Sequence, residues 1–117
     1  MERHVYTLVR RADWAAAEAE GRYTGSADDR RDGFLHFSTA AQLRATAARH
    51  RAGEADLVMV EALVEALGAL LRFEPPASGR AGIFPHLHGV LPLSAVTRVV
   101  PLPLGPDGLH VFPEGFP

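Results

Sequence analysis

The segment Asp56–Leu63 constrains the fold more than any other part of the sequence, because its side chains are apolar almost without interruption. A strand with one face in water alternates apolar and polar residues, whereas a nearly continuous apolar run is typical of a strand that is covered on both faces. The sequence therefore predicts a central β-strand over Asp56–Leu63, with the rest of the chain folded around it.

Two short helices are predicted in the N-terminal half. The first covers Trp14–Glu20, with Asp13 placed to cap its start. The second is opened by Thr39, which is spaced to form a capping box with Gln42, and it is expected to end at Gly53. Both helices carry apolar residues on one face, so each is expected to pack on the sheet.

The remaining segments predict further strands and loops. Runs of β-branched and aromatic residues are expected to be extended, and runs rich in Gly, Pro, Ser and Asp are expected to be loops. The extended segments are His4–Val9, Gly33–Phe37, Leu70–Glu74, Ile83–Val90 and Thr97–Leu102, and the loops are Arg22–Asp32, Pro75–Gly82 and the tail from Pro103. The chain thus predicts an α+β fold, a compact mixed and mainly antiparallel sheet with two short helices, in a single domain over residues 1–117.

The composition narrows the class of function. The chain carries 12 basic and 14 acidic residues and a net charge of −2, which argues against nucleic acid as a partner, since such binding depends on excess positive charge. It has no cysteine, so disulfides, thiolate catalysis and thiolate-bound metals are excluded. Its apolar runs are too short to predict a membrane span, and its first residues show no apolar signal sequence, so a cytoplasmic protein is expected.

The segment Asp32–Thr39 holds the most informative polar residues. Alternation along a strand turns every second side chain into the core and places Phe34, His36 and Ser38 together on the other face. A histidine beside hydroxyl groups is suited to bind or deprotonate a hydroxyl-bearing ligand, so His36 is a candidate catalytic residue and Phe34 a candidate ligand-binding residue. The alternative is that His36 is a buried, hydrogen-bonded histidine without a ligand.

The start of the second predicted helix is a candidate anion site. Its first N–H groups lack partners within the helix, and the aligned peptide dipoles make that end partly positive, which attracts phosphate. Ser38 and Thr39 at this end, with Arg31 just upstream, are therefore candidate ligand-binding residues. The alternative is that the capping box of Thr39 with Gln42, together with water, satisfies this helix end completely.

The segment Pro85–Gly89 contains a His-x-His pair. In an extended chain His86 and His88 face the same side, close enough to share a divalent metal. A closed metal site needs further ligands, and the pair is a weak signal without them. No metal is therefore predicted, and both histidines are interpreted as polar residues at the rim of a ligand-binding pocket.

Tyr6 lies on the first predicted strand and would line a cleft beside His36 if the two strands pair. It is therefore a second candidate catalytic residue, although most aromatic residues in a small domain belong to its core. The arginines at positions 44, 49 and 51 are expected to lie on the solvated face of the second helix.

Several short blocks together resemble a known family. The strand before the Trp14 helix is followed by Gly-Arg-Tyr (21–23), Asp-Gly-Phe-Leu-His-Phe-Ser-Thr (32–39), Asp-Leu-Val (56–58), Phe-Pro-His-Leu-His-Gly (84–89) and Leu-Pro-Leu (91–93). These blocks cover nearly the whole chain and are similar to the uncharacterised bacterial family known as domain of unknown function 952. One departure is at position 88, where the family pattern has Tyr and this sequence has His88.

That family more remotely resembles the ADP-ribosyltransferase-like fold group, whose compact split-sheet domains hold NAD in a cleft. The resemblance implies Tyr6 or His4 as the residue that orients a ribose and His36–Thr39 as the second strand of the cleft. It implies NAD as the candidate cofactor, while the residues themselves fix no cofactor. The group's late carboxylate has no clear counterpart, and His86 or Glu74 is the nearest candidate; an analogy at the level of the fold is associational.

The chain is therefore predicted to be a small-ligand-binding domain with a small-molecule or nucleotide ligand, of the type of an NAD- or nucleotide-using transferase. In this hypothesis Tyr6 stacks on the ligand, His36 fixes a hydroxyl, and the helix start at Thr39 faces a phosphate. The alternative is a non-catalytic binding or interaction module. The sequence leaves open whether the chain is an enzyme and which oligomer it forms.

Overall fold

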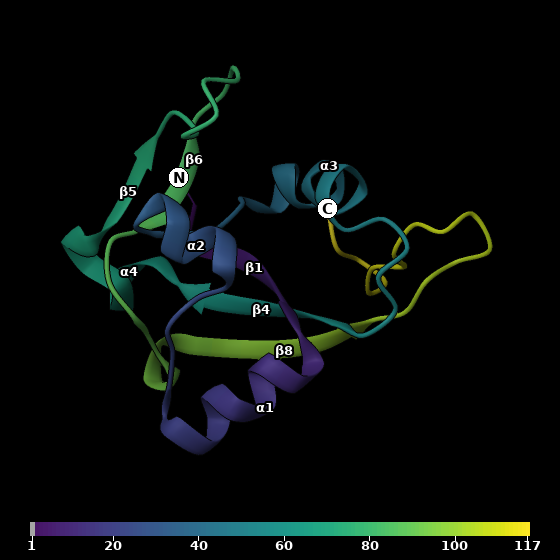
Figure 1. Ribbon diagram of the computed structural model, residues 1–117, viewed down its shortest axis with the longest axis horizontal. Coiled ribbons are helices and arrows are strands. Elements are labelled where there is room, and N and C mark those ends of the chain that lie inside the picture. Colours follow the sequence, from purple (N-terminus) through teal and green to yellow (C-terminus); the bar gives the residue numbers. More distant parts are fainter. Residues whose placement is uncertain (1) are drawn as a thin grey trace.

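The computed structural model describes residues 2–117, which are built around a three-stranded antiparallel sheet. Its strands are β1 (His4–Arg10), β4 (Leu57–Leu63) and β8 (Val96–Leu102), with β4 in the middle (Figure 1). Residues 57–60 of β4 are all buried, because both faces of the strand are covered. The prediction of a central strand in this segment is confirmed.

Shorter strands form two further sheets. The first contains β3 (Leu35–His36), β6 (Phe84–Leu87) and β5 (Leu71–Glu74) in the order β3-β6-β5. The second pairs β2 (Arg22–Tyr23) with β7 (Leu91–Pro92). All the pairings between these strands are antiparallel, and helices are present beside them, so the predicted α+β class is confirmed.

Residues 2–117 contain four α-helices, which are α1 (Arg11–Glu20), α2 (Ala27–Asp32), α3 (Ala40–His50) and α4 (Val64–Leu67), and two 3-10 turns at Gly68–Leu70 and Leu93–Ala95. Helix α1 begins at Arg11 rather than Trp14, so Arg10 is its N-cap and Asp13 lies in its first turn. A carboxylate there still favours the helix, because it offsets the positive end of the dipole. None of the described helices is long and apolar enough to cross a membrane.

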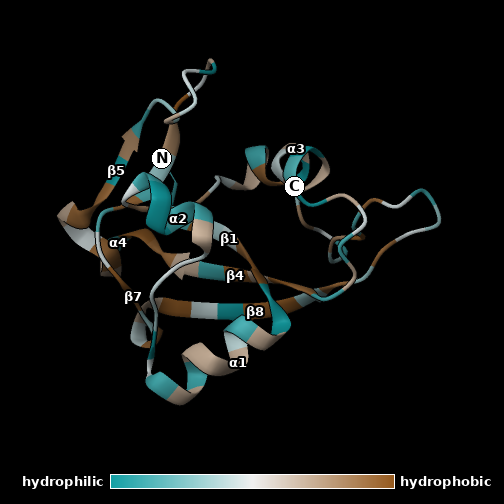
Figure 2. Cartoon of the chain, viewed as in Figure 1, coloured by the Kyte–Doolittle hydropathy of each residue, from teal (hydrophilic) through white to brown (hydrophobic). Residues whose placement is uncertain are grey.

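Residues Arg22–Asp32, predicted to form a loop, instead contain β2 and α2. A capping box closes the start of α2: Ser26 Oγ accepts from the Asp29 N–H (3.2 Å), and the Asp29 carboxylate accepts from the Ser26 N–H (2.8 Å). Figure 2 shows that α2 is almost entirely hydrophilic. Hydrophobic periodicity could not predict such a helix, because its stability comes from its cap and its charges.

Helices α1 and α3 cover opposite faces of the β1–β4 pair. Trp14 and Ala17 of α1 pack in a buried cluster with alternate residues of the strands, such as Val58 and Val60. Leu43 of α3 packs in a second cluster with the intervening strand residues, among them Met59. Because neighbouring residues of a strand face opposite ways, this two-sided packing explains the continuous apolar run in β4.

The C-terminal tail packs on α3 through Arg44. The Arg44 guanidinium lies 4.7 Å from the centroid of the Phe112 ring and donates hydrogen bonds to the carbonyls of Phe116 (2.9 Å) and Pro117 (3.0 Å). Arg44 is exposed on α3, as predicted, and its side chain also fastens the tail to the helix.

The chain crosses between two sheets directly after β3. The Phe37 N–H extends the pairing of β3 with β6 by donating to a β6 carbonyl (3.0 Å). Ser38 then pairs with Tyr6 of β1 through two backbone hydrogen bonds of 2.7 and 2.8 Å. Thr7 Oγ1 also donates to the carbonyl of His36 (2.9 Å). These contacts hold the end of β3 against β1, and α3 starts immediately beyond the crossing.

Candidate functional site

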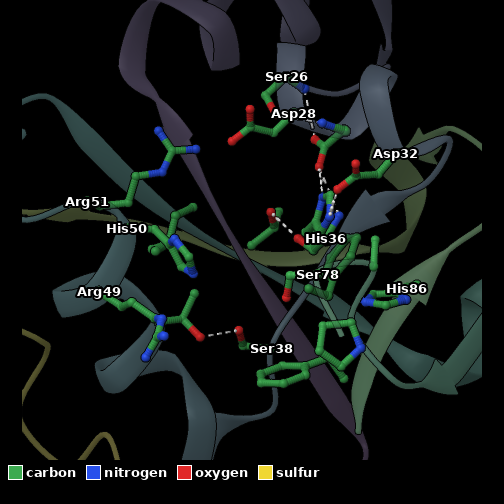
Figure 3. Close-up of a pocket in the computed structure, with 18 of the residues that line it drawn as sticks. Ser26, Asp28, Asp32, His36, Ser38, Arg49, His50, Arg51, Ser78 and His86 are labelled. Carbon is green, nitrogen blue, oxygen red and sulfur yellow. Dashed lines mark hydrogen bonds and ion pairs between the residues drawn. The ribbon is translucent and has the colours of Figure 1, made fainter. Parts of the chain in front are cut away.

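A cavity of about 400 Å³ lies where the chain crosses between these sheets (Figure 3). Its walls come from β1, α2, the crossing segment, the C-terminal end of α3, the loop over 76–80 and β6. Of the predicted site residues, the cavity is lined by Tyr6, Arg31, His36, Ser38 and His86, whereas Phe34, Thr39 and His88 lie outside its lining.

His36 is held between two carboxylates of α2. Its Nδ1 lies 2.5 Å from Asp29 Oδ1 and its Nε2 lies 2.9 Å from Asp32 Oδ2, and its backbone N–H also donates to Asp29 Oδ1 (3.0 Å). The hydrogen bond that His36 donates to Asp29 is the main cause of a raised pKa for His36, and it outweighs the opposing effect of burial. An ionised carboxylate can only accept, so both ring nitrogens carry hydrogen and His36 is an imidazolium.

Asp29 is the buried partner in this arrangement. Burial alone would raise the pKa of its carboxyl group, but the hydrogen bonds from His36 and from the Ser26 N–H lower it below the usual range. The same carboxylate therefore caps α2 and stabilises the protonated form of His36. Because both ring nitrogens carry hydrogen and contact carboxylates, His36 has no free lone pair in this state. It is therefore better suited to provide a fixed positive charge in the pocket wall than to accept a proton.

The imidazole rings of His36, His86 and His88 lie around Phe34. Its ring stacks on His86 at a centroid distance of 4.0 Å and an angle of 23°, and lies 4.8 Å from His36 and 5.2 Å from His88. Phe34 therefore contacts His36 and His86, which line the pocket, without lining it itself.

Glu74 of β5 joins both histidines of the His-x-His pair. Its Oε1 lies 3.0 Å from His86 Nδ1 and 2.5 Å from His88 Nε2. Burial is the main cause of a lowered pKa for His86, and it outweighs the hydrogen bond with Glu74, which acts in the opposite direction. Within residues 2–117 no group of three or more histidine or acidic side chains is arranged to hold a metal ion.

The C-terminal end of α3 adds arginines and a histidine to the pocket. Arg49, His50 and Arg51 line it together with Arg80 from the loop over 76–80. The pKa of His50 is lowered by burial and then by the charges of Arg80, Arg49 and Arg51. These arginines are therefore close enough to act on the same imidazole. Arg49 is exposed, as predicted, and Arg51 is half-buried, and both also line the pocket.

The N-terminal end of α3 is engaged with the protein itself. Gln42 Oε1 accepts from the Thr39 N–H (3.0 Å), and Gln42 Nε2 donates to the Ile83 carbonyl (2.7 Å). Ser38 is buried, and its hydroxyl donates to Thr46 Oγ1 (3.1 Å). The capping pair of Thr39 and Gln42 is thus present, and Ser38 lies in the pocket wall between β1 and α3.

Arg31 and Tyr6 line the pocket with their polar groups already engaged. Arg31 forms ion pairs with Asp32 (3.0 Å) and Asp28 (3.3 Å). The Tyr6 hydroxyl donates to Glu61 Oε2 (3.0 Å), and burial together with Glu61 raises the pKa of Tyr6 to about 12. Tyr6 is therefore neutral at pH 7.

Sequence reasoning missed Asp29, Arg49, His50, Arg51 and Arg80 as pocket residues. Ser26 followed three residues later by Asp29 was a usable signal, since it matches a capping box. No comparable sequence signal indicated that the arginines line the pocket. Their position depends on how far α3 extends along β1 after the chain has crossed between the two sheets.

The fold and the site define a small α+β protein with a polar pocket at the junction of two sheets. Residues 8–99 match the model of the family described as "Protein of unknown function (DUF952)", and the chain belongs to this family. The family that the sequence blocks predicted is thereby confirmed, whereas the resemblance to ADP-ribosyltransferases gains no support from the comparisons.

Two similar structures are of the protein CC0527 from Caulobacter crescentus. An X-ray crystal structure is 42% identical in sequence, with 92% of this chain and 93% of that chain covered and a TM-score of 0.85. A solution NMR structure is 43% identical, with 91% and 90% covered and a TM-score of 0.81. No curated protein matches the chain.

Proposed function

We propose that the pocket binds a small ligand that carries a phosphate group, of the class of a nucleotide. The observation that carries this proposal is the cluster formed by Arg49, His50, Arg51 and Arg80. Guanidinium groups match the geometry of phosphate oxygens and bind them through two parallel hydrogen bonds.

The charges in this cluster are not fully balanced by carboxylates. Arg51 lies 3.2 Å from Glu54, which it shares with Arg10 (3.3 Å). Arg49 and Arg80 have no carboxylate partner in the described part of the chain. Positive groups gathered at a concave surface raise the local concentration of anions, so a bound phosphate would offset their mutual repulsion.

The size of the cavity and its other wall suit the rest of such a ligand. About 400 Å³ lies within the range of small-molecule sites. Tyr6 and His36, the predicted catalytic residues, both line the cavity. The catalytic form of the proposal is therefore an NAD- or nucleotide-using transferase of ADP-ribosyltransferase type, with NAD as its cofactor, and the alternative is a non-catalytic binding or interaction module.

Binding is tested by titrating inorganic phosphate, AMP and NAD against the protein, with Arg Nε–Hε and histidine resonances followed by NMR. We expect shifts at Arg49, His50 and Arg80, and an Arg49→Ala/Arg80→Ala variant is expected to bind each ligand about tenfold or more weakly, because it lacks two charge-assisted hydrogen bonds. Arg22→Ala removes an exposed arginine of β2 as a matched control. Unchanged spectra at millimolar concentrations of all three ligands would contradict the proposal.

Turnover separates the catalytic form from the binding module. Wild-type protein is incubated with NAD, and release of nicotinamide is followed by chromatography against a sample without protein. Release above that background supports the transferase. NAD that binds and remains intact favours the module.

A further inference from the structure

His86 combines deep burial with one free ring nitrogen. Only 1% of its surface is exposed to solvent, and its Nδ1 lies 3.0 Å from Glu74 Oε1. The pKa of the Glu74 carboxyl is lowered by the hydrogen bond with His88 and then by that with His86, so the group is ionised. An ionised carboxylate only accepts hydrogen bonds, so Nδ1 of His86 carries the ring hydrogen. In the neutral ring Nε2 then holds a lone pair.

The other ring nitrogen of His86, Nε2, is not sealed from solvent. It has no hydrogen-bond partner within residues 2–117, yet it is absent from the side-chain nitrogens sealed from solvent, which among these residues are Trp14 Nε1 and His110 Nδ1. His86 lines the cavity, so the small exposed part of its ring opens there. Figure 3 shows His86 on the wall opposite Arg49, His50 and Arg51.

The ring is also held in a fixed orientation. Phe34 stacks on one face of it, and Glu74, which does not line the cavity, binds Nδ1. A base that is oriented by a carboxylate and presents its other nitrogen to a ligand is the arrangement that general-base catalysis requires.

We propose that His86 is the general base of this pocket, and that its Nε2 takes a proton from a hydroxyl group or water held beside a phosphate-bearing ligand, with Glu74 as the positioning residue. This inference rests on the proposed phosphate-binding function. It assigns the proton-accepting role to His86, which the sequence marked as a ligand-binding residue, instead of to His36.

The proton transfer is balanced within the pocket. The O–H bond of the hydroxyl or water breaks, an N–H bond forms at Nε2, and the electron pair stays on the oxygen. Glu74 stabilises the imidazolium that results. The His36 imidazolium, whose ring centroid lies 5.7 Å from that of His86, disfavours a second charge on His86 before the transfer and attracts the negative oxygen after it.

The placement of the base indicates the class of substrate. If the arginines hold the phosphate, a base on the opposite wall meets the other end of the ligand. The substrate is therefore a phosphate ester with a hydroxyl-bearing part remote from the phosphate, such as the ribose of a nucleotide.

The first test is the tautomer of His86, measured by long-range ¹H–¹⁵N NMR of protein with labelled histidine. We expect a neutral ring with hydrogen on Nδ1 at pH 7. In Glu74→Gln the preference for this tautomer is expected to weaken and the pKa of His86 to fall further, because the carboxylate that supports the cation is gone. Glu65→Gln, at an exposed position of α4, is the control and should leave both unchanged. A doubly protonated ring, or hydrogen on Nε2, would overturn the assignment.

The second test adds AMP or inorganic phosphate to the same sample. Both are expected to shift Arg49 and Arg80, whereas AMP alone is expected to move the Nε2 resonance of His86, since its ribose hydroxyls reach the far wall. Arginine shifts with an unmoved Nε2 would overturn the base but keep the phosphate site. If the resonances of Arg49 and Arg80 shift with neither ligand, the proposed function itself is overturned.

Discussion

His36 and His86 pair with each other in the β3–β6 register and line the same pocket, yet their pKa values are shifted in opposite directions. His36 has a carboxylate at each ring nitrogen, and its pKa is raised. His86 is more deeply buried, has one carboxylate, and its pKa is lowered. The difference shows that the number of carboxylates and the depth of burial, rather than the residue type or its strand, decide which imidazole is able to accept a proton.

The substitution Asp29→Asn is expected to have the largest effect on the difference between His36 and His86. Asp29 accepts from the Ser26 N–H, from the His36 N–H and from the His36 ring. An amide satisfies these donors poorly, so we expect a loss of about 2–3 kcal/mol in the free energy of unfolding and a lower pKa of His36. Urea denaturation and NMR titration measure both. Asp28→Asn, which removes an exposed partner of Arg31, is the control; equal losses in the two variants would contradict a special role for Asp29.

The pH dependence of stability separates the two histidines. For His36 the folded pKa is above the unfolded value of 6.5, so its stabilising contribution is complete below 6.5 and is lost as pH rises through the folded pKa. For His86 the folded pKa is below 6.5, so its contribution is present above 6.5 and is lost as pH falls through the folded pKa.

Melting temperatures measured from pH 5 to 9 therefore should show two limbs. His36→Asn is expected to flatten the alkaline limb, and His86→Asn to flatten the part of the acid limb just below pH 6.5. The result would count against the assigned charge states if either variant flattened the limb assigned to the other histidine.

A smaller effect is expected from Phe34→Leu, which removes the ring between the imidazoles. Loss of the stacked contact with His86 should lower the stability by about 1 kcal/mol. Water that reaches the ring should raise the pKa of His86 toward 6.5, because burial is what lowers it. Phe73→Leu, at a position that is 46% exposed on β5, is the control. An unchanged His86 titration would show that Phe34 does not shield this ring.

The central part of the fold could be predicted from the sequence, because burial on both faces of β4 leaves a direct mark in its apolar run. The polar helix α2 could not be predicted in this way. It is held by its cap at Ser26 and by contacts of Asp29 with a strand that follows it in the chain, and neither is a periodic signal.

The candidate site was predictable to the same limited degree. His36 and His86 were marked because each lies on a strand face with other polar residues, but their charge states depend on Asp29, Asp32 and Glu74, which the fold brings to them. An anion site was expected at the start of α3, whereas the arginines that line the pocket from this helix lie at its end. Which end of a helix meets a pocket is decided by the crossing of the chain before it, which residue types do not specify.

The joint between Ser38 and Tyr6 consists of backbone hydrogen bonds alone. The pairing itself therefore depends on no particular side chain at either position, whereas the Thr7 hydroxyl on the His36 carbonyl and the Ser38 hydroxyl on Thr46 are side-chain contacts of the same crossing. Proteins that keep this backbone pairing can therefore carry other residues at the two paired positions and still connect the two sheets beside the pocket.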